Sequence, residues 1–139
     1  SNLAYAHCVL VSVYLDTSAY STAKMSQVTQ GVLKEIVRPG NGPQVKTGNT
    51  ITVHCTGNLV TPPKKFWSTK DPGQKPFTFQ VGLGKVIQGW DEGCLSMHKG
   101  EIAKLTIDSK KGYGASGFPA WGITPNADLM FEIEILEIN

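Results

Sequence analysis

The stretch Val86–Gly93, with the sequence VIQGWDEG, indicates most about the fold of this chain. Its apolar residues and the following Cys94 recur at the spacing of one helix face. Gly89 and Gly93 weaken such a helix by about 1 kcal/mol each relative to alanine. A helix that keeps both glycines is expected to lie close against a sheet, with Trp90 as its largest inward-facing group. A core tryptophan is the plainer interpretation of Trp90, and the floor of a ligand site is the alternative.

Length and charge indicate a single domain without a nucleic-acid partner. The chain has 139 residues, a formal net charge of +2 and a pI near 8.4. This length suits one domain with a real core. The lysines are dispersed along the chain and form no basic stripe, and the pair Lys110 and Lys111 is interpreted as part of a solvated loop.

Cysteine and histidine usage argues against disulfides and metals. Cys8, Cys55 and Cys94 show no C-x-x-C spacing, and an odd, sparse set of cysteines is typical of a reducing compartment. We therefore predict a cytoplasmic protein. The three histidines have no metal-ligand spacing around them, so no metal and no cofactor are expected.

Residues 1–27 differ from the rest and are predicted to be an N-terminal extension to a domain at 28–139. The apolar run Leu3–Leu15 is too short to span a bilayer, so no membrane partner is expected. It has the length of a signal-peptide core but lacks a basic segment before it and a small-residue cleavage site after it. Met25 has the character of a native start. The extension is either a leader or a segment added during cloning.

From residue 28 onward, short apolar segments alternate with glycine and proline. In Thr50–Gly57, Ile51, Val53 and Cys55 alternate with polar residues, which predicts a half-buried strand with Cys55 facing the core. We expect an α+β fold, a five- to six-stranded antiparallel sheet wrapped around one short helix. The other predicted strands are Val32–Val37, Ile102–Asp108, Leu129–Ile138, and an interrupted strand with halves at Phe66–Thr69 and Phe77–Val81.

The long loop Ser109–Asp128 contains a literal G-x-G-x-x-G at Gly112–Gly117. A dinucleotide site needs a helix to begin there, and the following segment contains Pro119 and Pro125, so this motif is rejected. Instead, aromatic residues from different segments converge on the predicted inner face. Most of them suit a core, but Tyr113 lies in a glycine-rich loop and its hydroxyl needs a partner when it is buried. The set is Phe66, Phe77, Trp90, Tyr113 and Phe131.

Taken in order and spacing, the motifs of residues 30–138 resemble the FKBP-type peptidyl-prolyl isomerases, the immunophilins that bind tacrolimus and rapamycin, and most of all the small plant-type members. The motifs are Val53-His54-x-Thr56-Gly57, Lys65-Phe66, Lys75-Pro76-Phe77-Thr78-Phe79, Val86–Gly93, Ala103–Ile107, Tyr113-Gly114 and Leu129-x-Phe131.

The resemblance implies a proline-sized pocket with Trp90 as its floor. It gives catalytic roles to Phe66, Trp90, Tyr113 and Phe131. The backbone N–H of Ile87 and the hydroxyl of Tyr113 are expected to bind substrate carbonyls. The residues implied in binding are Cys55, Phe66, Trp67, Phe77, Val86, Ile87, Trp90, Tyr113, Phe118, Ile123 and Phe131. The implied partners are proline-containing peptides and proteins and the two macrolides, and the protein is expected to be a monomer.

Two positions depart from the family pattern. The family commonly has Tyr at Cys55 and Asp at Trp67, which hydrogen-bond each other at the pocket edge. Plant-type members with a cysteine at Cys55 often have a second one where this chain has Ile107, so that disulfide is not expected. Three functions stay open at this point: an isomerase, a non-catalytic binding module for proline motifs or macrolides, and a scaffold whose pocket is filled by Trp67.

Overall fold

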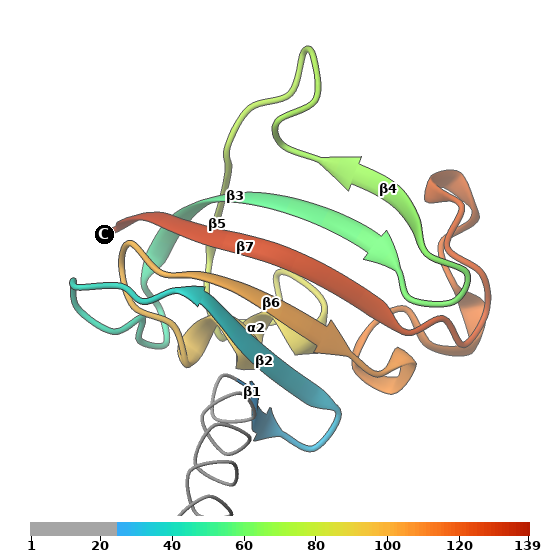
Figure 1. The fold of residues 1–139 in the computed structure, drawn as a ribbon, viewed down its shortest axis with the longest axis horizontal. Coiled ribbons are helices and arrows are strands. Elements are labelled where there is room, and N and C mark those ends of the chain that lie inside the picture. Colours follow the sequence, from blue (N-terminus) through green and yellow to red (C-terminus); the bar gives the residue numbers. More distant parts are fainter. Residues whose placement is uncertain (1–24) are drawn as a thin grey trace, which may run out of the picture.

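The computed structural model describes residues 25–139, which form seven strands and one α-helix (Figure 1). Three short 3₁₀ turns follow β6 along the chain, namely η1 (Ser109–Lys111), η2 (Gly114–Ser116) and η3 (Pro119–Trp121). The other elements are β1 (Met25–Thr29), β2 (Val32–Arg38), β3 (Thr50–Leu59), β4 (Lys64–Ser68), β5 (Phe77–Gln80), α2 (Gln88–Leu95), β6 (Ile102–Ile107) and β7 (Leu129–Ile138).

The strands form one antiparallel sheet in the order β1-β2-β6-β7-β3-β4, with β5 also paired to β3. This confirms the predicted α+β class and the sheet packed on one helix. β4 pairs with the second half of β3 and β5 with its first half, so the predicted interrupted strand is confirmed. The sheet has seven strands because these halves are separate and because Met25–Thr29 adds a further strand beside β2.

The first strand lies across the predicted domain boundary. β1 begins at Met25 and pairs Met25 with Glu35 and Ser26 with Lys34, so the boundary expected at residue 28 falls inside a strand. Met25–Gln27, predicted as part of the extension, belong to the sheet. Residues 1–24 of that extension lie outside the described residues.

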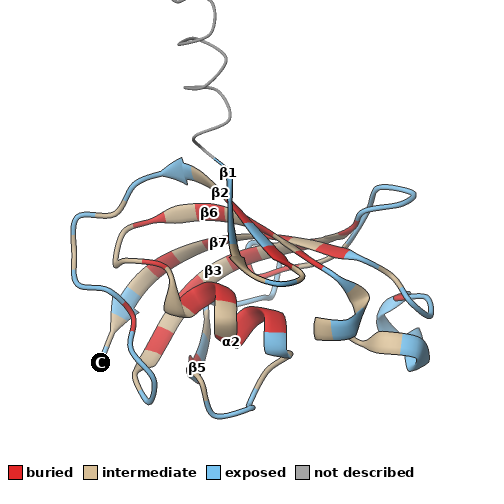
Figure 2. Ribbon diagram, turned by 90° about the horizontal axis from the view of Figure 1, so that it is seen from below, coloured by how far each residue is buried: buried red, intermediate tan, exposed pale blue. Residues whose placement is uncertain are grey.

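Alternating burial along the two longest strands builds the core. On β3, Ile51, Val53 and Cys55 are buried while the residues between them are partly exposed, as the alternation predicted. β7 lies beside β3 and follows the same pattern (Figure 1). Because successive strand residues point to opposite faces, each strand supplies one apolar row to the same side of the sheet. Helix α2 covers that side (Figure 2).

The two glycines of α2 allow the helix to lie against β6. An added Cβ at Gly89 would lie 2.4 Å from Cγ2 of Ile107, with two more atoms of that side chain at 2.8 Å. An added Cβ at Gly93 would lie 2.4 Å from Cδ1 of Leu105. The close approach predicted from the sequence is therefore confirmed, since no larger residue fits at Gly89 without a shift of the buried Ile107.

A carboxylate fixes the loop that leads into the helix. Asp91, only 9% exposed, accepts the backbone N–H of Gly82 at 2.9 Å and that of Gly84 at 3.0 Å. Asp91 also lies in the first turn of α2, where a negative charge is favourable. The Val81–Val86 loop is thereby held at a set position relative to the N-terminus of α2.

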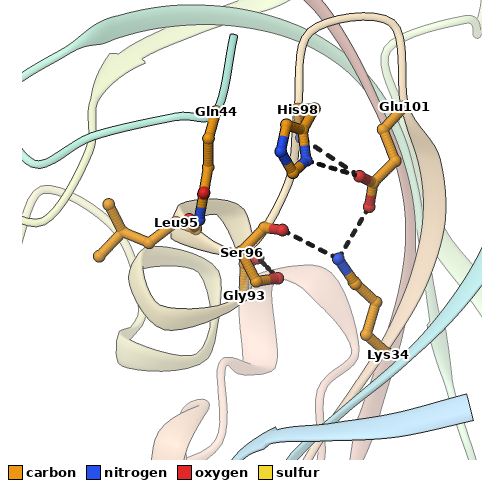
Figure 3. A network of polar contacts seen from close by, with 7 residues as sticks. All are labelled: Lys34, Gln44, Gly93, Leu95, Ser96, His98 and Glu101. Carbon is orange, nitrogen blue, oxygen red and sulfur yellow. Dashed lines mark hydrogen bonds and ion pairs between the residues drawn. The ribbon is translucent and has the colours of Figure 1, made fainter. Parts of the chain in front are cut away.

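A buried ion pair holds the other end of the helix (Figure 3). Nζ of Lys34 on β2 donates to Oε2 of Glu101 at 2.9 Å and to the carbonyl of Ser96 at 3.0 Å. Both side chains of this pair are almost fully buried. Gln44 donates to the carbonyl of Leu95 at 3.0 Å. These bonds satisfy backbone carbonyls that the end of a helix leaves without partners.

We expect Gly89→Ala to destabilise the fold and Gly93→Ala to do so less. Overpacking a core costs about 1–3 kcal/mol, whereas replacing a helical glycine by alanine gains about 1 kcal/mol. The methyl group added by Gly89→Ala meets the branched, buried Ile107, while the one added by Gly93→Ala meets only the end of Leu105. Urea denaturation of both variants measures the difference. Equal stability of Gly89→Ala and the unaltered protein would contradict the close approach.

Candidate active site

A β-bulge on β4 turns two consecutive aromatic residues toward the same region. Gly57 of β3 pairs with Trp67, but the next residue, Asn58, pairs with Lys65, so Phe66 has no partner across the ladder. A bulge of this kind bends a strand and changes the direction of a side chain. As a result the Phe66 ring contacts the Phe131 ring and the Trp67 ring contacts the Trp90 ring. Strict alternation would have placed Phe66 and Trp67 on opposite faces.

Gly57 leaves the space that these rings occupy. It lies in register with Trp67 on one side and with Phe131 on the other. An added Cβ would lie 2.7 Å from both Cε1 of Phe131 and Cζ of Phe66. The absence of a side chain at Gly57 therefore lets aromatic rings from β4 and β7 meet above β3.

Trp90 forms the floor of the site, where α2 faces the sheet. It is 3% exposed and lies edge-on to the ring of Phe131, with centroids 5.3 Å apart and planes at 87°. Phe77 is also edge-on to it at 5.9 Å, and Trp67 lies at 6.2 Å with the planes tilted by 32°. Edge-to-face contacts at these distances are favourable for aromatic pairs.

Above this floor is a cavity of about 220 Å³ with a predominantly apolar wall. Trp67 lies against Trp90 without filling this space, so the geometry does not favour the scaffold with a filled pocket. The cavity is lined by Trp67, Phe77, Lys85, Val86, Ile87, Trp90, Tyr113, Trp121 and Phe131.

Two polar groups at the cavity are available to a ligand. The backbone N–H of Ile87, at the N-cap of α2, has no acceptor among residues 25–139. The Tyr113 hydroxyl likewise makes no hydrogen bond within this part of the chain, and burial raises the pKa of Tyr113 above its usual value of 10.0. Both groups can donate to a carbonyl oxygen. They are the two donors that the sequence analysis predicted.

The indole N–H of Trp90 is a third polar group, and it is buried with no hydrogen-bond partner in residues 25–139. An unsatisfied buried donor costs about 1–3 kcal/mol. The floor of the cavity thus presents the Trp90 ring together with one N–H donor that no group in residues 25–139 satisfies.

A closed turn in the β6–β7 loop places another tryptophan at the cavity. Phe118 and Ile123 exchange backbone hydrogen bonds of 2.9 and 3.1 Å, and η3 with Trp121 lies between them. The Trp121 ring stacks on the Trp67 ring at 5.7 Å and on the Phe66 ring at 6.4 Å. These contacts attach the turn to β4. In the same loop, the segment 112–117 follows η1 and contains η2, and no α-helix begins there, in agreement with the rejection of the dinucleotide motif.

Four of the residues predicted to bind do not line the cavity. Phe66 lies one layer behind it, against Trp121 and Phe131. Phe118 is 38% exposed and contacts Tyr113 and Trp121 from outside the lining. Ile123 and Cys55 are each 2% exposed and belong to the hydrophobic core.

The placement of Cys55 follows from the strand alternation. Its side chain is on the buried face of β3, between Val53 and Gly57, and its backbone N–H is bonded to the Thr69 hydroxyl. Burial raises the pKa of the Cys55 thiol to about 12, so the group stays neutral and unreactive at physiological pH. Cys55 supports the packing beneath the site and does not offer a polar group to a ligand.

Two lining residues, Trp121 and Lys85, were not predicted. The sequence did contain a signal for Trp121, because a tryptophan in a surface loop rich in glycine and proline often contributes to binding. In the structure its side chain is 42% exposed. Lys85 had no comparable signal, since a lysine in a loop is ordinarily solvated. Its place at the cavity depends on the loop that Asp91 fixes.

An ion pair connects the helix that carries Trp90 with the loop that carries Tyr113. Nζ of Lys111 lies 2.5 Å from Oε1 of Glu92, and each side chain is about one-fifth exposed. The Thr29 hydroxyl of β1 and Nε2 of Gln88 also donate to this carboxylate. Partial burial disfavours the charged form, but the three hydrogen bonds and the charge of Lys111 outweigh it and lower the pKa of Glu92. The solvated role predicted for Lys111 is therefore wrong.

Within residues 25–139, no group of three or more histidine, cysteine, aspartate or glutamate side chains is arranged to hold a metal ion. No helix of that region is long and apolar enough to cross a membrane.

Comparison with known proteins gives the class to which this fold and site belong. Residues 42–136 match the family of FKBP-type peptidyl-prolyl cis-trans isomerases, and the chain belongs to that family. It is 58% identical over 113 residues to peptidyl-prolyl cis-trans isomerase FKBP12 of Arabidopsis thaliana, covering 78% of this chain and 98% of that protein. It is 57% identical over 108 residues to the protein of the same name from Vicia faba, covering 76% and 96%. FK506-binding protein 1 of Saccharomyces cerevisiae is 43% identical over 117 residues, covering 83% and 100%.

We expect the Glu92–Lys111 pair to contribute a coupling energy of about 0.5–1.5 kcal/mol, because its atoms are close and partly shielded from water. A double-mutant cycle of Glu92→Gln and Lys111→Met, followed by urea denaturation, measures it at pH 7. The exposed pair Lys65–Asp71 is the control and should couple by less. The pKa of Glu92 is lowered in the folded protein from its usual value of 4.5. The coupling is therefore fully present at neutral pH, and it is lost as the pH falls below 4.5 and passes the lowered folded-state pKa. Coupling no larger than that of the control would contradict the structural role.

Proposed function

We propose that this protein catalyses the cis–trans isomerisation of X–Pro peptide bonds in its aromatic cavity and also binds macrolides of the tacrolimus type. The observation that supports this most is a predominantly apolar cavity of about 220 Å³, floored by Trp90. Beside it lie the Tyr113 hydroxyl and the Ile87 N–H, which has no acceptor in residues 25–139. Membership of the FKBP-type isomerase family supports the same activity.

The reaction needs neither a nucleophile nor an acid–base pair. Rotation about an amide C–N bond has a barrier of about 18–20 kcal/mol, because the twisted bond loses resonance. A planar amide has more charge separation than a twisted one and is therefore better solvated by water. An apolar wall such as that of Trp67, Phe77 and Phe131 disfavours the planar form relative to the twisted form.

The two hydrogen-bond donors hold the peptide while the bond rotates. The Ile87 N–H belongs to the N-cap of a helix, where backbone donors have no intrahelical acceptor. One substrate carbonyl binds there and a second binds the Tyr113 hydroxyl, while the prolyl ring contacts Trp90. Binding both sides of the proline leaves the X–Pro bond as the part of the peptide that turns.

The size of the cavity indicates how a macrolide is bound. Sites that enclose drug-sized ligands usually have volumes of about 300–1,000 Å³. A cavity of about 220 Å³ accommodates a ring the size of proline, so most of a macrolide lies outside it, over Trp121 and the rim. A non-catalytic module that captures proline motifs or macrolides and presents them to a partner is the alternative function, because it uses the same contacts.

An isomerisation assay on a proline tetrapeptide separates these functions. We expect turnover by the unaltered protein and a several-fold lower kcat/KM in Trp90→Leu, because this change removes part of the aromatic floor but no reacting group. Affinity for tacrolimus, measured by titration calorimetry, should fall by at least about ten-fold in the same variant, which corresponds to 1.4 kcal/mol. Val37→Ala, on the exposed part of β2, is the control. Macrolide binding without any turnover would favour the binding module.

We expect the activity to be independent of pH between about 6 and 9. Tyr113 is the donor that could titrate, and burial places its pKa above 10.0, so the hydroxyl stays protonated over this range. Tyr113→Phe should lower kcat/KM by about two- to ten-fold, as expected for the loss of one neutral hydrogen bond. The measurement is a pH profile of both proteins with circular dichroism at each pH. An inflection near pH 6.5 would show that a histidine takes part, contrary to the proposed mechanism.

We further propose that the protein is a monomer and that it functions in the cytoplasm. A reducing compartment suits the buried free thiols of Cys55 and Cys94. Light scattering at micromolar concentration measures the oligomeric state.

A further inference from the structure

Among residues 25–139, Lys85 is the one residue with a formal charge in the lining of the aromatic cavity. Its side chain is exposed, and within residues 25–139 it forms no ion pair and no side-chain hydrogen bond. No aspartate or glutamate of the described part of the chain lines the cavity. The site therefore presents an ammonium group without a counter-charge from the part of the chain that the structure describes.

The loop around Lys85 holds this charge near the donor that binds substrate. Asp91 bonds the N–H groups of Gly82 and Gly84, so the backbone just before Lys85 is fixed. Lys85 is also only two residues from Ile87, whose N–H has no acceptor in residues 25–139 and can donate to a substrate carbonyl. Both carboxylate oxygens of Asp91 accept backbone N–H groups of this loop, and the ion pairs of residues 25–139 do not include Asp91 with Lys85.

The segment that builds most of the cavity is itself basic. Residues 60–90 supply six of the residues that line the cavity, namely Trp67, Phe77, Lys85, Val86, Ile87 and Trp90. This segment contains five lysines and a single acidic residue, Asp71, so its net charge is +4. The whole chain has a net charge of +2, and the remainder is therefore negative by two. Lys65 of this segment is paired with Asp71, whereas Lys85 lies at the cavity itself. A cation at a binding site favours anionic ligands over cationic ones.

We propose that Lys85 is a specificity-determining residue that favours prolyl substrates with a carboxylate side chain next to the proline. This inference rests on the proposed isomerase function and specifies its substrate class. A lysine can lay its carbon chain on the aromatic wall while its ammonium group stays at the rim. The prolyl ring then occupies the floor, and an adjacent aspartate or glutamate side chain meets the ammonium group at the rim.

The expected preference is small, because Lys85 is exposed and the interaction is screened by water and salt. Exposed ion pairs correspond to about two- to five-fold changes in an equilibrium or rate constant. A preference of this size changes kcat/KM through substrate binding and leaves the rotation step itself to the aromatic wall.

The test compares peptides that differ only in the charge next to proline. Two series, acetyl-Ala-Xaa-Pro-Phe-amide and acetyl-Ala-Leu-Pro-Xaa-amide, carry Glu, Gln or Lys at Xaa, so that no terminal charge interferes. Exchange spectroscopy by NMR gives kcat/KM for each peptide at about 20 mM salt. We expect the Glu peptide to exceed the Gln peptide by about two- to five-fold in at least one series, and the Lys peptide to be the poorest.

The ratio of the Glu to the Gln peptide is then measured in variants. Lys85→Gln should bring the ratio close to one, and Lys85→Glu should invert it in favour of the Lys peptide. Lys46→Gln, away from the cavity, is the matched control and should keep the ratio. Salt at about 0.5 M should reduce the ratio in the unaltered protein, because it screens exposed charges.

The outcomes separate this inference from the proposed function. Equal kcat/KM for Glu and Gln peptides in both series overturns the role of Lys85 while isomerisation itself stands. If the Lys85→Gln variant still prefers the Glu peptide, other lysines cause the preference, and this result also overturns the inference. Absence of turnover on every peptide is the result that contradicts the proposed function.

Discussion

The contact of Gly89 and Gly93 with Ile107 and Leu105 is the constraint on which the site depends. Without side chains at these two positions, α2 lies directly on β6, and Trp90 between them reaches the aromatic rings of the sheet. A helix held further away by even one methyl group would lift Trp90 and the Ile87 N–H together. The two glycines lower the intrinsic stability of the helix, but they allow the close packing that positions Trp90 and the Ile87 N–H.

Polar groups fix the ends of this helix but stay out of the cavity. Asp91 bonds the loop before the helix, and the Lys34–Glu101 pair bonds the chain after it (Figure 3). Glu92, with Lys111, connects the helix to the loop of Tyr113. Buried polar groups are tolerated when they are satisfied, and these are. The wall of the cavity can then be mainly aromatic and aliphatic, which suits the rotation of an amide.

The aromatic wall also depends on how β4 pairs with β3. The bulge at Phe66 and the missing side chain at Gly57 allow Phe66, Trp67 and Phe131 to gather on one side of the sheet. Trp121 stacks on Trp67 and Phe66 and so attaches the long loop to β4. The rim of the site is therefore made from segments that lie far apart in the chain.

The amino-acid sequence by itself determined the features that depend on local pattern. Alternation gave the buried faces of β3 and β7 and the inward side chain of Cys55, and the two glycines gave the close packing of α2. The tertiary structure alone decided the rest. A one-residue shift in strand pairing put Phe66 and Trp67 on the same face. Cys55 and Ile123 are buried in the core and do not line the cavity. Loop packing places Lys85 and Trp121 in the lining. Register and loop packing depend on contacts between distant residues, and no local periodicity records them.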